Sequence, residues 1–386
     1  MTRKLLSVAV AGVFAAPAVA MAQASTVQLY GKITAEYGYV DQGDGRPNTD
    51  MLQTPGGSAV GVKGEEKLGG GLSAWFQCES SADVRGVSQE GFCSRNSALG
   101  FKGGFGNIHI GRWDTPFKRA INVGMIGAGD TGLLGAAFLM AGSSTGTGAT
   151  GGQGFSQSLS RNVWKRRESS QIYYESPTFS GFQVLASYSA ANATREVDAT
   201  TGSKPRVESL AAIYANGPLA LSAAYERHDD FGAVGGGNDD RGWTLNASYK
   251  FGGVKVAAAY IDTKYEMSTG TDITKKNWMV GVDWHISGPH NLEAAYVQAG
   301  DSKGNATTNT GLTSGNGPIA LPGSDTGAKL YEVAYRHDFS KRTSAKLAYV
   351  KLDNDNNASY SLGGLRAPVT AGQNQSAFVL YMQHSF

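Results

Sequence analysis

The residues of this chain best placed to act on another molecule form a basic run after a long glycine-rich segment. The run contains Arg161, Lys165, Arg166 and Arg167. The acidic residues of the same segment, 114–168, are Asp114, Asp130 and Glu168. Charges that face one another across a narrow opening select ions and solutes by electrostatics. The cluster therefore indicates selection by charge rather than catalysis.

Motifs for catalysis or cofactor binding are weak in this sequence. GAGDTG at 127–132 and GTGATG at 146–151 match G-x-G-x-x-G, but neither lies between a strand and a helix, as a dinucleotide site requires. The six histidines show no metal-ligand spacing, and no G-x-S-x-G sequence marks a nucleophilic serine. We expect no cofactor, no metal and no enzymatic activity.

The first 24 residues have the features of a secretory signal peptide. Two basic residues at 3–4 precede an apolar stretch, and A-Q-A at 22–24 matches a signal-peptidase site, so cleavage is expected before Ser25. A transmembrane helix needs roughly 18 or more apolar residues, and 25–386 contains no such run. We expect an exported protein whose single domain, 25–386, has no transmembrane helix.

Charge and composition narrow the class of protein. Loss of the leader would remove two basic residues, leaving 32 of the 34 Lys and Arg against 32 Asp and Glu. A near-neutral chain lacks the basic surface on which nucleic-acid binding depends. The 53 glycines, 17 tyrosines and only 11 prolines favour many short strands joined by tight turns. We therefore expect an all-β fold and no nucleic-acid partner.

The chain has two cysteines, Cys78 and Cys93. An even pair in an exported protein favours a disulfide, and these two lie where neighbouring strands would be joined by a hairpin loop. Two free thiols are the alternative. A catalytic cysteine is disfavoured because no histidine lies near either one in the sequence.

Alternation between apolar and polar residues predicts the strands. In VQLYGKITAEYGYV, which starts at Val27, the polar face holds Gln28, Lys32, Thr34 and Glu36. Eight later segments, from VESLAAIYA to SAKLAYVKL, are similar, and nearly every one carries an aromatic residue near an end. Aromatic residues at both ends of many strands are typical of the girdles of a membrane barrel. Cross-strand aromatic packing in a soluble sheet is the alternative.

Short turns and long loops alternate along the chain. Seven short turns lie at 68–71, 103–106, 177–181, 216–218, 251–253, 287–290 and 339–342. Eight longer polar connections lie at 41–56, 85–93, 114–168, 191–205, 229–240, 265–275, 301–326 and 352–374. Turns at one edge and loops at the other are typical of outer-membrane barrels. We expect a transmembrane antiparallel β-barrel of about 16 strands, with both termini on the short-turn, periplasmic side.

The chain ends SAFVLYMQHSF, a strand that stops at Phe386 and can pair with the first strand to close a barrel. The chain resembles the general porins of β-proteobacteria, a trimeric Gram-negative family. The resemblance rests on this terminal aromatic residue, the YGKI start, VGVKGEEKLGGGLSAWF, RNSALGFKGGFGNIHIGRWDTPF and IYYESPTFSGF. The resemblance extends over essentially all of 25–386. It implies a homotrimer in the outer membrane, in contact with lipid and lipopolysaccharide. It also implies assembly by the barrel-assembly machinery through the C-terminal strand.

The resemblance assigns a role to segment 114–168 as well. In the family the third loop bends into the lumen and faces a basic ladder on the wall, and a barrel of 16–18 strands leaves a water-filled channel. The constriction residues expected here are Arg167, Arg166, Lys165, Arg161, Asp114 and Asp130, with Lys63, Lys32 and Arg95 on the wall. Ala59 stands where family members often carry an arginine, which predicts a wider or less basic opening.

Alternation also predicts which way the wall residues point. Counting by twos along the strands sets Arg167, Lys63 and Lys32 toward the lumen. The same count sets Arg95 on the outer face unless a bulge reverses it, and Arg112 has the same ambiguity. The direction of these two side chains therefore stays open.

We expect an outer-membrane porin for the passive diffusion of ions and small hydrophilic solutes. Modest charge selectivity, with anions the favoured sign, would come from the third loop. The alternatives are a substrate-specific outer-membrane channel, an outer-membrane hydrolase and a soluble secreted β-sandwich.

Overall fold

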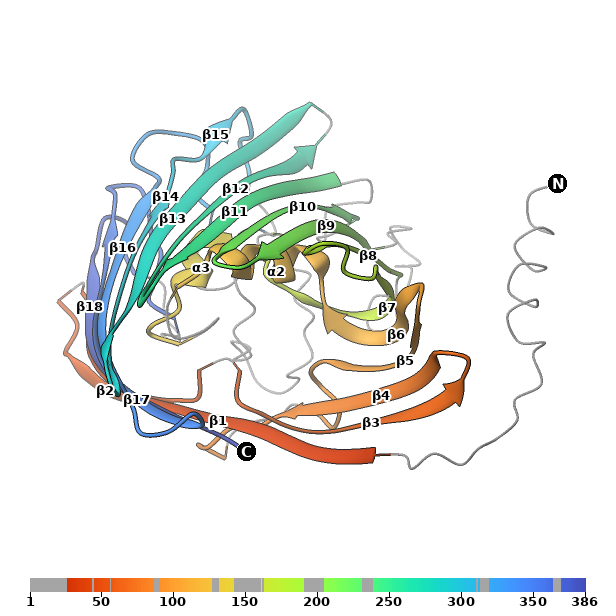
Figure 1. Ribbon diagram of the computed structural model, residues 1–386. Coiled ribbons are helices and arrows are strands. Elements are labelled where there is room, and N and C mark those ends of the chain that lie inside the picture. Colours follow the sequence, from red (N-terminus) through yellow and green to blue (C-terminus); the bar gives the residue numbers. More distant parts are fainter. Residues whose placement is uncertain are drawn as a thin grey trace.

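The protein is one closed antiparallel sheet (Figure 1). The computed structural model describes residues 26–43, 45–55, 57–86, 91–126, 132–141, 161, 163–190, 205–230, 239–268, 270–309, 312, 319–363 and 369–386. The strands of this part of the chain are β1 (Thr26–Asp41), β2 (Thr49–Gln53), β3 (Ala59–Gly69), β4 (Leu72–Ser81), β5 (Ser97–Gly103), β6 (Gly106–Asp114), β7 (Arg167–Glu175), β8 (Phe182–Ser189), β9 (Arg206–Asn216), β10 (Leu219–Asp229), β11 (Asp239–Phe251), β12 (Val254–Ser268), β13 (Thr271–Ser287), β14 (His290–Ala299), β15 (Lys303–Gly304), β16 (Ala328–Asp338), β17 (Thr343–Asn354) and β18 (Gln375–Ser385).

Seventeen of these eighteen strands fill the sixteen strand positions of the barrel wall in the described chain. β2 pairs with the second half of β1 and β3 with its first half, so the two together occupy one strand position. β15 has two residues and only extends the edge beside β13. The expected all-β antiparallel barrel of about 16 strands is confirmed.

The first and last strands close the barrel. β1 pairs with β18 from Lys32 opposite Ser385 to Asp41 opposite Ser376. Gly31 and Phe386 also exchange both backbone hydrogen bonds, at 3.1 and 3.0 Å. A Cβ on Gly31 would lie 2.3 Å from the Phe386 ring, so the absence of a side chain there makes room for the terminal aromatic ring. The C-terminal strand thus pairs through its last residue, which leaves no open edge at this seam.

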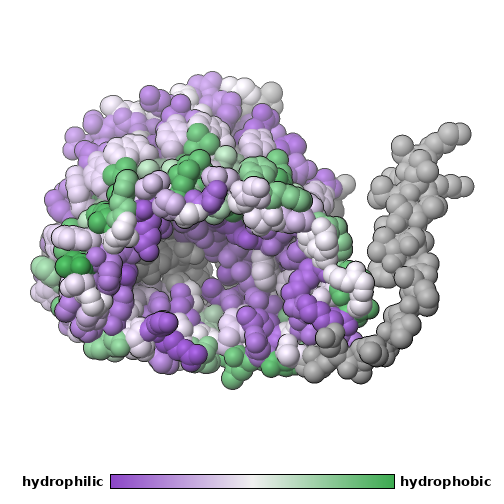
Figure 2. All heavy atoms as spheres, in the orientation of Figure 1, coloured by the Kyte–Doolittle hydropathy of each residue, from purple (hydrophilic) through white to green (hydrophobic). Residues whose placement is uncertain are grey.

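The two faces of the wall differ as alternation predicts. In β1, Thr34, Glu36 and Gly38 are buried on the inner side, whereas Tyr37 and Tyr39 are exposed on the outer side. Figure 2 shows hydrophilic residues around the central hollow and patches of hydrophobic residues on the outside of the wall. This is the arrangement of a barrel that stands in lipid and encloses water.

One expected loop is largely strand instead. A loop is predicted at 265–275, but β12 runs to Ser268 and β13 begins at Thr271, with these two residues opposite each other. Alternation continues through the supposed loop, because Tyr265 and Ile273 are buried on the inner face between polar residues. The prediction is wrong here because the outer residues of these two long strands are polar, as loop residues are.

The described helices all belong to segment 114–168 and lie inside the ring of strands (Figure 1). They are α2 (Pro116–Ile121), the single 3₁₀ turn η2 (Asn122–Gly124) and α3 (Ala136–Ala141). Thr115 is the N-cap of α2: its hydroxyl accepts the backbone N–H of Lys118 (3.3 Å), and Pro116 follows as the first helical residue. None of the helices in the described residues has the length and apolar character to cross a bilayer.

Candidate functional site

The loop between β6 and β7 starts on the inner wall at β9 and β10. The backbone N–H of Phe117 donates to the hydroxyl of Ser209 on β9 (3.0 Å). The hydroxyl of Ser222 on β10 donates to the carbonyl of Ala120 (2.7 Å). Phe117 is fully buried, so α2 is held to the wall by apolar packing as well as by these hydrogen bonds.

The middle of the loop contacts other parts of the wall. The backbone N–H of Leu133 donates to the carboxylate of Glu36 on β1 (2.6 Å). The side-chain amide of Asn277 on β13 donates to the carbonyls of Leu139 and Met140, at 3.2 and 2.9 Å. The described parts of the loop are therefore fixed to inward-facing side chains on several sides of the barrel.

The last part of the loop returns through a buried ion pair and a buried tryptophan. Arg161 donates from Nε to Asp240 on β11 (2.7 Å), and both side chains are fully buried. The indole N–H of Trp164 donates to the hydroxyl of Tyr265 (2.8 Å), and the indole stacks on His228 at a centroid distance of 4.2 Å. Arg161 thus binds the loop to the wall, in a position that water does not reach.

Lys165 and Arg166 are also buried. The Arg166 guanidinium pairs with Glu168 (2.6 Å) and lies against His228 (3.3 Å). Nζ of Lys165 contacts the sulfur of Met125 (3.4 Å). The structure therefore brings Arg161, Lys165 and Arg166 to the junction of loop and wall, and all three have side chains that are nearly inaccessible to solvent.

Arg167 and Asp114 meet at the two ends of the loop. Their side chains form an ion pair (3.0 Å), Asp114 also pairs with Lys118 (3.2 Å), and Nε of Arg167 donates to Asn96 (2.5 Å). The count by twos does not extend to Arg167, because the run of buried residues on β7 is Tyr173, Gln171 and then Glu168. Ser170 has a φ of +54°, and the pairing register with β6 shifts at the same level.

The wall residues predicted from sequence form a second group on β1, on β3 and in the connection after β4. Lys63 is exposed, and its Nζ lies 5.1 Å from the centre of the Tyr30 ring. Arg95 pairs with Glu79 (2.8 Å), and Glu79 also accepts the hydroxyl of Tyr30 (3.1 Å). Because Tyr30 shares the inner face of β1 with Lys32, the side chain of Arg95 reaches the inner face rather than lipid.

Lys32 and Arg112 complete the predicted basic positions that the structure describes. Lys32 is half-buried, and its Nζ would lie 2.8 Å from a Cβ placed on Gly57. Arg112 donates to the hydroxyl of Ser169 (3.1 Å). Asp130 lies outside the described residues.

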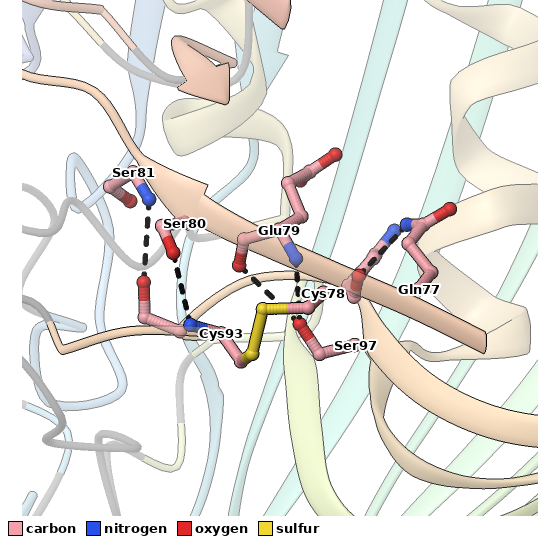
Figure 3. The surroundings of a disulfide bond; sticks show 9 residues. Gln77, Cys78, Glu79, Ser80, Ser81, Cys93 and Ser97 are labelled. Atoms are coloured by element: carbon pink, nitrogen blue, oxygen red, sulfur yellow. Dashed lines mark hydrogen bonds between the residues drawn. A yellow bond between two sulfur atoms is a disulfide. The ribbon is translucent and has the colours of Figure 1, made fainter. Parts of the chain in front are cut away.

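Cys78 and Cys93 form a disulfide that joins the end of β4 to the following connection (Figure 3). Around it, the backbone N–H of Cys93 donates to the hydroxyl of Ser80 (3.0 Å), and that of Glu79 donates to Ser97 (2.9 Å). The bridge therefore fixes the segment that carries Arg95 next to Glu79.

The same connection is tied to the one before it by Asp83. Its carboxylate accepts the hydroxyl of Thr54 (2.8 Å) and the guanidinium of Arg85 (2.7 Å). Burial alone would raise the pKa of Asp83, but the hydrogen bonds from Arg85 and Thr54 outweigh it and lower the pKa to about 2. This carboxylate stays ionised at every physiological pH.

Sequence reasoning missed the wall residues that hold the loop: Glu36, His228, Asp240 and Asn277. The available signal was a charged or amide side chain at an inward position of a strand, where it must find a partner if the loop covers it. The loop predicted at 229–240 includes Asp240, which lies in β11 in the structure. No group of three or more metal-ligating side chains occurs in the part of the chain that the structure describes.

Comparison with known proteins identifies the family. The family model of Gram-negative porins matches residues 7–357. The chain belongs to the Gram-negative porin family. Over its whole length it is 28% identical to outer membrane porin protein 32 of Delftia acidovorans, which is also covered completely. An outer membrane porin protein of Bordetella pertussis is 26% identical, with 89% of this chain and 92% of that protein covered.

Solved structures share the fold. The anion-selective porin from Comamonas acidovorans has a TM-score of 0.74 at 24% identity and covers 94% of this chain and all of its own. OmpT of Vibrio cholerae in its trimer form has a TM-score of 0.64 at 16% identity, with 94% of this chain and all of that one covered. The resemblance found in the sequence is confirmed, and this porin is an outer-membrane channel for passive diffusion.

Proposed function

We propose that this porin passes ions and small hydrophilic solutes with a modest preference for anions. The observation that carries the proposal is the position of Lys63, which is exposed on the inner face and forms no ion pair within the described residues. Lys32 lies on the same face two strand positions along β1 from Tyr30. The described acids of segment 114–168 are already paired, Asp114 with Lys118 and Arg167, and Glu168 with Arg166. A positive local potential in the lumen favours anions.

A protein of similar fold supports the preference for anions over cations, since the Comamonas acidovorans structure is that of an anion-selective porin. The burial of Arg161, Lys165 and Arg166 supports a modest effect, because Arg161 is paired with Asp240, Arg166 is paired with Glu168, and all three side chains are nearly inaccessible to solvent.

The test is the reversal potential of the purified protein in a planar bilayer under a potassium chloride gradient. We expect stable ohmic conductance and a reversal potential on the chloride side of zero. A potassium-side value would overturn the anion preference, and a barrel that conducts nothing would overturn the channel itself.

We also propose that the protein is a homotrimer. Exposed apolar residues run across the outer faces of β3 to β7: Val60, Phe76, Leu99, Ile110 and Ile172. A contiguous apolar face of this kind suits self-association in a protein whose fold neighbour has a trimer form. Native mass spectrometry should give three copies, and a monomer that conducts would contradict the proposal.

The remaining proposals concern export and surroundings. Residues 1–24 are removed on export, both termini face the periplasm, and the strand ending at Phe386 is recognised by the barrel-assembly machinery. The outer face contacts outer-membrane lipid, including lipopolysaccharide. N-terminal sequencing of the mature protein tests the cleavage site, and protease access from each side of the membrane tests the orientation.

A further inference from the structure

Four aromatic rings cluster on the inner face of β4, β6 and β7. Trp75 on β4 is directly opposite Gly100 on β5, Gly100 is opposite His109 on β6, and His109 is opposite Tyr173 on β7. Trp113 joins these rings through contacts with Trp75 and His109. The aromatic platform, as we call it, consists of Trp75, His109, Trp113 and Tyr173. The exposed apolar residues next to it along the strands belong to the outer face, so the platform borders the lumen.

Ring contacts and a missing side chain fix the platform in place. His109 stacks on Tyr173 with a centroid distance of 4.7 Å and an interplanar angle of 15°. It also makes T-shaped contacts with Trp75 (5.2 Å) and Trp113 (4.9 Å). Neither ring nitrogen of His109 has a hydrogen-bond partner within the described residues, so the imidazole acts as a flat packing group. A Cβ on Gly100 would lie 2.8 Å from Nε1 of Trp75, so glycine lets the indole lie across β5.

The two indoles are the accessible part of the platform. His109 and Tyr173 are buried, with 2% and 0% of their surface exposed, whereas Trp75 and Trp113 are half-buried. The indoles contact each other at a centroid distance of 5.7 Å. They therefore present rigid aromatic surface to solutes in the lumen. Surface of this kind packs well against the C–H groups on one face of a sugar ring, because neither side needs hydrogen bonds.

A row of polar side chains lies directly beside the platform, on the side of the short turns. Lys102 on β5 is opposite Asn107 on β6, and Asn107 is opposite Glu175 on β7. We call these three residues the polar row. Each lies two positions from the level of His109 on its strand, which is roughly 7 Å. The indole N–H of Trp75 donates to Oδ1 of Asn107 (2.8 Å), and the amide nitrogen of Asn107 has no partner within the described chain.

The charges of the polar row are already compensated. Glu175 pairs with Arg119 of α2, and Lys102 pairs with Glu65 on β3. An anion would have to displace a carboxylate from one of these bases. A hydroxyl group has no such requirement, because it can donate to a paired carboxylate and accept from an amide or guanidinium at the same time. The row therefore suits a neutral ligand with several hydroxyl groups.

We propose that the aromatic platform and the polar row form a low-affinity carbohydrate site in the lumen, on the short-turn side of the third loop. One sugar ring lies with its C–H face on Trp75 and Trp113, and its hydroxyl groups bind Asn107 and Glu175. The separation of about 7 Å between platform and row is close to the width of one sugar ring with its hydroxyl groups. The site rests on the proposed function as an open channel, in which a solute must bind weakly enough to leave again.

The test is blockage of the open channel by sugar in a planar bilayer. The conductance of the purified full-length protein is recorded first in potassium chloride alone, and then with maltotriose or with a poly(ethylene glycol) of similar size. We expect maltotriose to reduce the current along a saturation curve with a half-blocking concentration in the millimolar range, whereas the polymer should not saturate. No saturation with maltotriose would overturn the site. No conductance in potassium chloride alone would instead overturn the proposed channel, so the two failures are distinguishable.

The indoles are tested by substitution. Trp75→Leu and Trp113→Leu should each raise the half-blocking concentration of maltotriose about threefold to tenfold, because each removes one aromatic contact. Trp75→Phe should retain most of the binding, since an aromatic face remains. Trp243→Leu is the matched control, because Trp243 is 40% exposed on the outer face and should leave the blockage unchanged. Equal half-blocking concentrations in both leucine variants and wild type would show that the rings only pack the start of the third loop.

The polar row is tested separately. Asn107→Ala should raise the half-blocking concentration of maltotriose about threefold, because it removes a hydrogen-bonding group and leaves both indoles in place. This variant and Trp75→Phe decide the matter even where a leucine variant fails to assemble. Glucose and gluconate, which are similar in size, test the charge of the ligand. Tighter saturable blockage by gluconate than by glucose would show that the row selects an anion and would overturn the proposal of a neutral sugar.

Discussion

The carboxylate of Glu36 on β1 accepts the backbone N–H of Leu133, a residue 97 positions further along the chain, at 2.6 Å. Glu36 is almost completely buried, and Leu133 is fully buried. The contact fixes the middle of the third loop to the seam where the barrel closes, because β1 is also the partner of β18. Glu36 is therefore one of several wall residues that hold the loop, together with Asn277 on β13 and Asp240 on β11.

Gly132→Ala should displace the loop. Gly132 has a φ of +99°, and a Cβ there would lie 2.5 Å from the Glu36 carboxylate, so the substitution strains the backbone and crowds the acceptor. We expect a cost of about 1–3 kcal/mol and a larger, noisier single-channel conductance with the barrel still folded. Gly70→Ala is the control, since its φ is +57° but nothing lies within 4 Å. Identical conductance in Gly132→Ala and wild type would show that the contact does not position the loop.

Arg161→Leu should destabilise the barrel without changing its ion preference. The variant leaves Asp240 buried without its partner, which typically costs about 3–5 kcal/mol. The double variant R161L/D240L should recover part of that loss, because neither charge then remains. The measurement is the midpoint of urea unfolding. The reference is Lys351→Gln, which removes the solvent-exposed ion pair between Lys351 and Asp353. A shift of reversal potential with unchanged stability would mean that Arg161 acts in the lumen.

Arg161 also shows how far sequence reasoning extends. Four bases close together in the sequence were grouped by charge, but each has its own partner: Asp240, Met125, Glu168 and Asp114. Those partners come from β6, β7, β11 and the loop itself. Which pairs form depends on where distant strands lie, and that information is absent from the local pattern.

The barrel itself was predictable because its strands depend on neighbouring residues and not on distant ones. Strand alternation has a period of two and is set by neighbouring residues, so sixteen strands and the closing partner of Phe386 could be derived from the sequence. The count failed where the backbone departs from that period, at Ser170 with its φ of +54°. One such residue reverses the faces of everything before it on the strand, which is why the direction of Arg167 could not be counted.

Lys63→Glu should shift the reversal potential toward cations. A unit charge in water acts with roughly 0.4 kcal/mol at about 10 Å, so reversing Lys63 should change the chloride-to-potassium permeability ratio about 15-fold without salt and about twofold to fourfold after screening by about 0.1 M salt. Arg166→Gln is the contrasting variant, because Arg166 is buried against Glu168 and should affect stability instead. A large shift in Arg166→Gln and none in Lys63→Glu would place the selective charge at the loop junction.

The hydrogen bond from Thr54 to Asp83 should hold the connection before β3 to the connection after β4 down to low pH. The folded-state pKa of Asp83 is about 2, below the ordinary value near 3.9, so its contribution to stability is fully present above about pH 4. That contribution is lost as the pH falls through about 2, when the carboxylate takes up a proton. The observable is hydrogen-exchange protection of the Arg85 amide, which donates to Asp83 (2.9 Å), between about pH 2 and 5. After correction for the intrinsic rate, wild type should lose protection only near the lower limit. Asp83→Asn should show weak protection that is independent of pH, and a loss of wild-type protection near pH 4 would contradict the lowered pKa.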